Sequence, residues 1–260
     1  MGNVTFGDGG FVMIAGPCAV ESRAQMMATA EHVARCGGHM VRGGAYKPRT
    51  SPYAFQGLGD TGVTLMSAAS EEAGLPSVVE VLREQQLSFA AKYIDMIQIG
   101  ARNMQNFGLL KASAQTGKPI LLKRAASATL DELLYAAEYI LLQGNQRVVL
   151  CERGVRGFDQ ETRNVFDLGG ALRLKQLTHL PVIADPSHAT GRSSLVAPLV
   201  IASAAAGLDG AIIEVHPHPT QALCDAAQAL DFAAFSGLME RLAGVVSLQT
   251  PAKIATSVGR

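Results

Sequence analysis

Four side chains with metal-binding donor atoms follow short apolar segments that lie far apart in this sequence. They comprise one thiol, one imidazole and two carboxylates: Cys18, His188, Glu214 and Asp225. Such a mixed set suits a borderline divalent ion such as Mn²⁺, Fe²⁺, Co²⁺ or Zn²⁺. The competing interpretation is ordinary packing, because a free cysteine is usually a small core residue and a glutamate can pair with a nearby arginine. The residues alone leave both interpretations open.

A second group consists of cationic side chains at or just after the ends of apolar segments. It comprises Arg42, Lys47, Arg49, Arg102, Lys123, Arg124 and Arg153. Residues two apart on a strand point to the same face, so Lys123 continues the face of Leu121 and Arg102 that of Gln98. Solvation explains most surface arginines and lysines, but apolar strands have no need of cationic ends. The pattern therefore predicts a polyanion site, where arginine can bind carboxylate and phosphate oxygens in pairs.

The elements that must position these groups alternate regularly. Strands are predicted at 11–16, 40–45, 76–81, 96–101, 119–124, 147–152, 181–186 and 210–215. Helices are predicted at 22–36, 61–73, 83–93, 105–116, 129–143, 167–178, 193–206, 220–229 and 234–247. Strand and helix units joined by short connections predict an α/β protein, a single (β/α)8 TIM barrel domain over residues 1–260. In that fold the C-terminal strand ends surround one cavity, and the first, seventh and eighth strands are neighbours.

Composition narrows the class of protein. The chain is 48% hydrophobic and has 22 basic and 22 acidic residues, which argues against a general nucleic-acid or anionic-membrane surface. The longest apolar stretch, 195–208, is too short to span a bilayer, and the segment MGNVTFGDGG lacks the pattern of an export signal. Four cysteines without CxxC spacing predict free thiols in a cytoplasmic chain.

The remaining polar residues carry weaker predictions. Cys36, Cys151 and Cys224 are expected to pack in the core, Cys224 within the predicted helix 220–229. His216 continues the strand face of Glu214 and is expected to support the site, whereas His179 is expected at the surface. The long connection from Tyr46 to Asp60 is expected to be ordered and functional.

The chain as a whole resembles the 3-deoxy-D-arabino-heptulosonate 7-phosphate (DAHP) synthases in their short type I form. The motifs that carry the resemblance run in order along nearly the whole chain. They are GPCAVES at 16–22, RGGAYKPRTSPYAFQGLG at 42–59, IQIGARNMQNF at 97–107, LLKR at 121–124, ILLQGNQRVVLCERG at 140–154, TRNVFDL at 162–168, LPVIADPSHATGR at 180–192 and IIEVHPHPTQALCDAAQAL at 212–230. Family members commonly have a glycine directly after LLKR, where this chain has Ala125. This difference leaves Lys123 itself unchanged.

The resemblance assigns roles to the residues singled out above. It implies that the metal is held by Cys18, His188, Glu214 and Asp225. It implies that phosphoenolpyruvate is bound by Arg42, Lys47, Arg102, Lys123 and Arg153. It places the phosphate of erythrose 4-phosphate on Arg49 and Thr50. The expected catalytic residues are Lys47, Lys123 and His188.

The implied activity is a metal-dependent, aldol-type condensation of phosphoenolpyruvate with erythrose 4-phosphate, the first step of the shikimate pathway. The resemblance also implies a cytoplasmic homo-oligomer, a tetramer or a dimer, and leaves room for chorismate mutase as a partner in trans. The ten or so residues before the first strand hold no regulatory domain, so the barrel is expected to be insensitive to phenylalanine, tyrosine and tryptophan.

Other interpretations remain. The related 3-deoxy-D-manno-octulosonate 8-phosphate synthases use arabinose 5-phosphate and typically carry a KANRS-type segment where this chain has KPRTS at 47–51, so the seven-carbon product is favoured. A weakened barrel kept as a binding subunit is possible in principle, but no expected ligand or anion-binding residue is missing. An isomerase or aldolase barrel would use a Schiff-base lysine or a glutamate base and no thiolate ligand.

Overall fold

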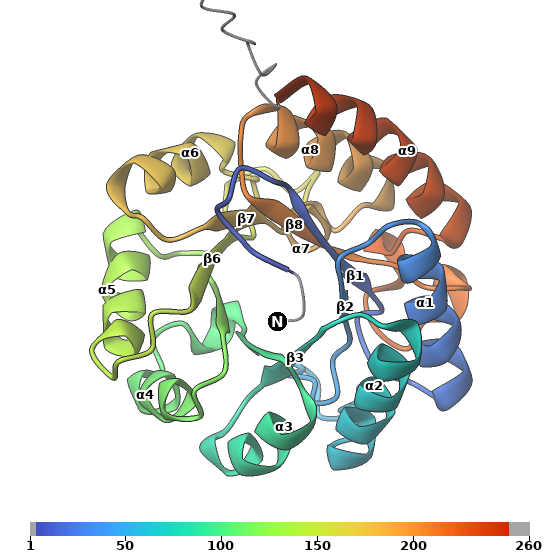
Figure 1. The fold of residues 1–260 in the computed structure, drawn as a ribbon, viewed down its shortest axis with the longest axis horizontal. Helices are drawn as coiled ribbons and strands as arrows, with labels where there is room; N and C mark the ends of the chain where they lie inside the picture. Colours follow the sequence, from blue (N-terminus) through green and yellow to red (C-terminus); the bar gives the residue numbers. More distant parts are fainter. Residues whose placement is uncertain (1–3, 250–260) are drawn as a thin grey trace, which may run out of the picture.

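Short runs of apolar residues form parallel strands that close into one eight-stranded barrel (Figure 1). The strands are β1 (Val12–Gly16), β2 (Met40–Arg42), β3 (Ser77–Val81), β4 (Met96–Ile99), β5 (Ile120–Lys123), β6 (Val148–Glu152), β7 (Val182–Ala184) and β8 (Gly210–Glu214). Closure is complete because β8 pairs with β1 over the whole length of both strands. This computed structural model describes residues 4–249 and confirms the predicted (β/α)8 fold. Residues 1–3 and 250–260 of the predicted single domain lie outside the described residues.

Helices ring the barrel and cover its outer face, except for a short one at 186–190 that lies beside β8 (Figure 1). They are α1 (Arg23–Arg35), α2 (Asp60–Ala73), α3 (Leu87–Tyr93), α4 (Phe107–Gln115), α5 (Leu130–Leu141), α6 (Leu168–Leu177), α7 (Pro186–Thr190), α8 (Ser193–Ala205) and α9 (Phe232–Gln249). The described residues also form four 3₁₀ turns: η1 (Glu84–Gln86), η2 (Ala101–Asn103), η3 (Pro219–Gln221) and η4 (Ala226–Gln228). Local signals set their ends: Thr129 and Glu132 form a capping box at the start of α5, and Gly74 ends α2 with φ 67°.

The strands bury side chains on both faces, so the core has two layers. Residues on the outer strand face pack against the helices. The inner face fills the barrel with Val12, Ile14, Met40, Val78, Met96, Leu121, Val149, Cys151, Ile183 and Ile212. Cys151 is therefore a packing residue, as predicted. The next inward-facing positions toward the C-terminal strand ends carry polar groups, and this alternation supplies the floor of the site.

Two predictions about the helices were incomplete or wrong. The predicted helix 220–229 is absent; η3 and η4 stand there instead, with Cys224 and Asp225 in the loop between them. Asp225 has a left-handed backbone with φ 51°, which a continuous helix cannot contain. The short helix α7 was not predicted; it begins at Pro186, directly after the N-cap residue Asp185, whose side chain accepts a hydrogen bond from the His188 N–H.

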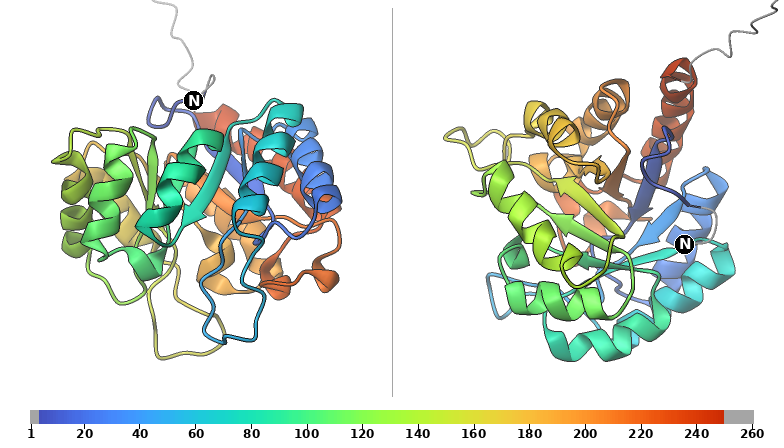
Figure 2. Two further views of the ribbon diagram at one scale, coloured as in Figure 1. Left: turned by 90° about the horizontal axis from the view of Figure 1, so that it is seen from below. Right: turned by 60° about the vertical axis from the view of Figure 1, so that its left-hand side comes forward.

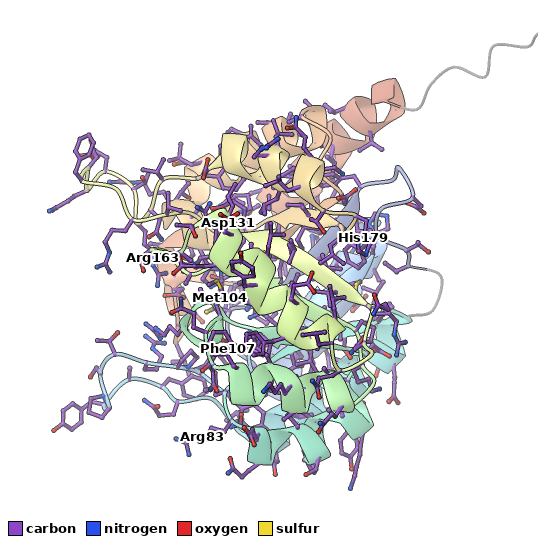
Figure 3. The ribbon with its side chains drawn as sticks, turned by 90° about the vertical axis from the view of Figure 1, so that its left-hand side faces the viewer. Arg83, Met104, Phe107, Asp131, Arg163 and His179 are labelled. Carbon is purple, nitrogen blue, oxygen red and sulfur yellow. The ribbon has the colours of Figure 1, made fainter. Side chains whose placement is uncertain are left out.

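Two long loops project from one end of the barrel (Figure 2). One follows β2 and spans 43–59; the other follows β6 and spans 153–167. Figure 3 shows Arg163 at this end of the barrel and His179 at the opposite end. The loops thus flank the C-terminal strand ends, where the predicted site residues gather. Within residues 4–249, none of the helices has the length and apolar character needed to cross a bilayer.

Candidate functional site

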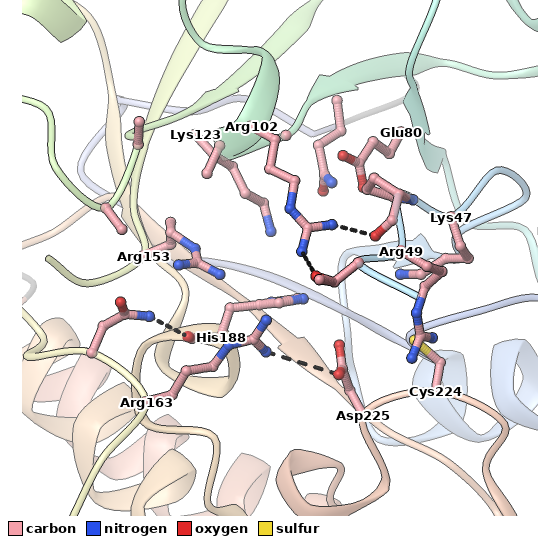
Figure 4. Close-up of a pocket in the computed structure, with 18 of the residues that line it drawn as sticks. Lys47, Arg49, Glu80, Arg102, Lys123, Arg153, Arg163, His188, Cys224 and Asp225 are labelled. Atoms are coloured by element: carbon pink, nitrogen blue, oxygen red, sulfur yellow. Dashed lines mark hydrogen bonds and ion pairs between the residues drawn. The ribbon is translucent and has the colours of Figure 1, made fainter. Parts of the chain in front are cut away.

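A cavity of about 700 Å³ opens at the C-terminal end of the barrel between the two long loops. Its lining is strongly cationic and includes Lys47, Arg49, Arg102, Lys123, Arg153, Arg156 and Arg163. Figure 4 shows the guanidinium groups of Arg102, Arg153 and Arg163 around the same space as His188. So many positive charges around one hollow favour ligands that carry several negative charges.

The four predicted metal ligands converge on one side of this cavity. The donor atoms of Cys18, His188, Glu214 and Asp225 all lie within 4.8 Å of one another. Cys18 Sγ is 3.3 Å from Asp225 Oδ2, and His188 Nε2 is 3.1 Å from Glu214 Oε1. Donors bound about 2.0–2.3 Å from a single ion lie at most about 4.6 Å apart. The quartet therefore fits a divalent transition metal in donor chemistry, and its spread of up to 4.8 Å is close to this limit.

Cys18 follows β1, and polar side chains surround its thiol. Lys47 Nζ is 3.0 Å from Cys18 Sγ and also donates to the Cys18 carbonyl oxygen. Cys224 Sγ lies 3.1 Å from Cys18 Sγ, and Arg49 Nη1 lies 2.7 Å from Cys224 Sγ. The hydrogen bond with Cys224, burial and the charge of Glu214 raise the pKa of Cys18 well above its usual value, while Lys47 opposes them. Cys224 is buried and packs beside Cys18 and Ala19, as predicted, and it also lines the cavity.

Asp185 holds His188 in place. His188 Nδ1 is 3.0 Å from Asp185 Oδ1, which leaves Nε2 directed at Glu214. Burial alone would lower the pKa of His188, but the carboxylates of Asp185 and Glu214 raise it to about 10. A carboxylate behind a ligand histidine fixes the orientation of its ring. Asp185 also pairs with Lys123, so the two buried charges balance each other.

The carboxylate of Glu214 is fully buried at the end of β8 and held from two sides. Arg42 Nη1 donates to Glu214 Oε1 at 2.8 Å, and Gln228 Nε2 donates to Glu214 Oε2 at 2.8 Å. Arg42 Nε is buried and has no partner within the described part of the chain. Arg42 is not among the lining residues of the cavity; it stands behind Glu214 instead. His216 faces Glu21 at 3.5 Å and lies outside the cluster of donors.

The other predicted anion-binding residues line the cavity, with the exception of Arg124, which pairs with Glu152 and Asp167 instead. Lys123 and Arg153 stand at the ends of β5 and β6, and burial lowers the pKa of Arg153. Arg102 donates to the Pro48 carbonyl oxygen and, at 3.3 Å, to Thr50 Oγ1. It thereby ties the segment that carries Arg49 and Thr50 to the wall of the cavity (Figure 4).

Sequence reasoning assigned no role to several residues that the fold brings here. Asp185 was within reach of the strand pattern, because it lies two residues after the inward-facing Ile183. Arg163 and Gln228 had no such signal. The loop bearing Arg163 is held by the pairing of Val155 with Val165, and the sequence pattern does not predict this contact.

Comparisons with known proteins give a consistent set of similarities. The profile of the DAHP synthetase I family matches residues 2–247. A phospho-2-dehydro-3-deoxyheptonate aldolase of Thermotoga maritima is 48% identical over 242 residues, covering 93% of this chain and 72% of that protein. The crystal structure of the Thermotoga maritima DAHP synthase superposes with a TM-score of 0.92 at 45% identity, covering 95% of this chain and 72% of that chain. A 2-dehydro-3-deoxyphosphooctonate aldolase of Syntrophotalea carbinolica is 31% identical, covering 88% of each chain.

Proposed function

The chain belongs to the DAHP synthetase I family of transferase-type enzymes, and on that premise we propose that it makes 3-deoxy-D-arabino-heptulosonate 7-phosphate. The substrates would be phosphoenolpyruvate and erythrose 4-phosphate, and the reaction would be the first step of the shikimate pathway. Sequence identity supports the seven-carbon product, since this chain is 48% identical to the heptonate enzyme and 31% identical to an octonate enzyme.

The observation that carries the proposal is the position of the metal-competent quartet beside a cationic cavity, whose wall includes His188 and Asp225. Phosphoenolpyruvate has a phosphate and a carboxylate, and erythrose 4-phosphate has a phosphate and an aldehyde. A pocket for both must neutralise several negative charges and bring two anions into contact. Preorganised arginine and lysine side chains neutralise these charges without having to reorganise during the reaction.

We assign the cations to the two substrates as the family resemblance implies. Lys123, Arg102 and Arg153, which line the cavity, would bind phosphoenolpyruvate, and Arg42 would support them from behind Glu214. Arg49 and Thr50, on the loop after β2, would bind the phosphate of erythrose 4-phosphate. The enol carbon C3 then attacks the aldehyde carbon, water adds at C2, and phosphate leaves by C–O cleavage.

Lys47 would lie between the two bound substrates. Burial alone would lower its pKa, but the charge of Cys18 raises it, so Lys47 keeps its proton. Its Nζ can therefore donate to the aldehyde oxygen as negative charge develops there. Cys18, His188, Glu214 and Asp225 would hold a divalent ion of the Mn, Fe, Co or Zn kind. Such an ion supplies Lewis-acid polarisation of a carbonyl oxygen.

One assay tests the proposal. The purified protein, loaded with Mn²⁺, is offered phosphoenolpyruvate with either erythrose 4-phosphate or arabinose 5-phosphate, and phosphate release is followed. Turnover with the four-carbon aldehyde and little with the five-carbon one is the expected result. The reverse preference would identify an octulosonate enzyme, and turnover with neither would support a binding subunit.

Three further expectations belong to this proposal. Both substrates are phosphorylated anions of central metabolism, which supports a cytoplasmic location. A homo-oligomer, tetramer or dimer, is proposed from membership of the family, and sedimentation velocity tests it. Control by chorismate mutase in trans stays a prediction that co-sedimentation of the two purified proteins would check.

A further inference from the structure

Two residues without an assigned role link both carboxylates of the quartet to each other. Gln228 lies in η4 and is 2% exposed, and Arg163 lies on the loop after β6. Arg163 Nη1 lies 3.3 Å from Gln228 Oε1 and 3.8 Å from Asp225 Oδ1. Gln228 in turn donates to Glu214. A continuous chain of polar contacts thus runs from Asp225 through Arg163 and Gln228 to Glu214.

Gln228 controls the orientation of the Glu214 carboxylate. Oε1 of Glu214 accepts from Arg42 and faces His188 Nε2, while Oε2 accepts from Gln228 Nε2. With a separate donor on each oxygen, the carboxylate plane cannot rotate freely. The amide of Gln228 is itself fixed, because its oxygen faces a guanidinium and its nitrogen faces a carboxylate.

Arg163 is anchored to the element that carries His188. Its main-chain N–H donates to the Thr190 carbonyl oxygen at 2.9 Å, and the N–H of Asn164 donates to the Ala189 carbonyl oxygen at 2.7 Å. A Cβ at Gly191 would lie 3.1 Å from Arg163 Cβ, so the two backbones are closely packed. The position of Arg163 therefore follows that of α7, which bears His188, while its guanidinium faces Asp225 and Gln228.

We propose that Gln228 and Arg163 are positioning residues that hold Glu214 and Asp225 in the geometry for a divalent ion and so raise the metal affinity of the site. The inference rests on the proposed function, in which the quartet binds the metal. Groups behind the ligands typically contribute 10–100-fold to metal affinity, because they restrict ligand orientation and tune ligand charge. Here the bridge formed by Arg163 and Gln228 contacts two ligands, Glu214 and Asp225. It also connects them to α7, the helix that carries His188.

A merely structural role is the alternative, in which the bridge fastens the loop 153–167 to η4. Such a role would change thermal stability and leave the metal affinity of the folded protein alone. The two roles separate when metal binding is measured on folded protein, and a matched pair elsewhere in the chain provides the control. On α6, Arg173 Nη1 donates to Gln176 Oε1 at 3.0 Å on an exposed face.

The experiment titrates metal-free protein with Mn²⁺ and follows the free ion by electron paramagnetic resonance. The variants are Gln228→Leu and Arg163→Met, with Arg173→Met and Gln176→Leu as controls. We expect a dissociation constant about 10–100-fold higher for Gln228→Leu. A smaller increase is expected for Arg163→Met, with partial recovery in Arg163→Lys. The controls should bind as the unaltered protein does.

Cobalt gives a second readout. Co²⁺ bound by the thiolate of Cys18 absorbs in the near ultraviolet, and its visible bands report the ligand geometry. We expect the thiolate band to persist in both variants and the visible bands to change. At saturating metal, kcat should fall more than the KM for phosphoenolpyruvate rises.

The outcomes are distinguishable from failure of the proposed function. If the unaltered protein binds no divalent metal, the proposed metal centre is wrong. If it binds metal and both folded variants bind equally well with unchanged visible bands, the positioning roles are wrong and the function stands. Should Gln228→Leu fail to fold, Arg163→Met decides, because the Arg163 side chain is 40% exposed and its loss leaves no buried void.

Discussion

Replacing Lys123 by methionine is the sharpest single perturbation of the anion pocket. The Lys123 side chain is 4% exposed and pairs with Asp185, which is 1% exposed. Methionine keeps most of the volume and removes the charge. If Lys123 binds phosphoenolpyruvate, losing the charge-assisted hydrogen bond between them should cost on the order of 2–4 kcal/mol of transition-state stabilisation. That corresponds to a fall in kcat/KM of roughly 30- to 900-fold.

The same change has a stability consequence that can be separated from catalysis. Without Lys123, the buried Asp185 loses one of its two ion pairs and keeps the one with His188. Breaking a buried pair from one side typically costs about 3–5 kcal/mol, because one charge stays in the interior uncompensated. In Lys123→Met, Asp185→Asn that charge is absent, so much of the stability should return while kcat/KM stays low.

Two measurements on the single and double variants are needed. Urea unfolding of each protein gives the free energy of unfolding, and steady-state turnover at saturating metal and erythrose 4-phosphate gives kcat/KM for phosphoenolpyruvate. A Lys123→Met protein with near-normal kcat/KM would refute the assignment of Lys123 to the substrate. Equal stability of the single and double variants would refute the reasoning about Asp185.

Three further predictions follow from the structure. Removing the metal with a chelator should abolish turnover, and adding Mn²⁺ should restore it. In calorimetry, Cys18→Ala should bind Mn²⁺ weakly. Full activity of metal-free Cys18→Ala would contradict the ligand assignment. Arg124→Met should destabilise the barrel by roughly 3–5 kcal/mol in urea unfolding, because Arg124 Nη1 is 2.9 Å from the buried Glu152 carboxylate; Glu152→Gln in the same background should recover part of the loss. Burial and, to a smaller extent, the charge of Arg35 lower the pKa of His32 below its usual value. Stability from His32 is thus present above its unfolded pKa of about 6.5 and is lost as pH falls below it, so His32→Gln should flatten the acid side of a plot of stability against pH.

The sequence by itself determined the barrel and most of the site floor. Alternation along short strands is a local property, and it placed Lys123 on the same face as Leu121, which fills the barrel, before any fold was known. The right order of strands followed from the regular succession of strand and helix. Once a barrel was inferred, convergence of its strand ends required Cys18 and His188 to approach each other.

Only the tertiary structure decided what the loops do. Cys224 falls within the predicted helix 220–229, yet it lies in an irregular segment beside the thiol of Cys18. Arg163 and Gln228 meet Asp225 and Glu214 through contacts between segments far apart in the chain. A strand's side-chain directions follow from its own backbone, whereas a loop's conformation is chosen by the surfaces against which it packs. For that reason the residues that hold the ligands in place became visible only when the whole barrel had closed.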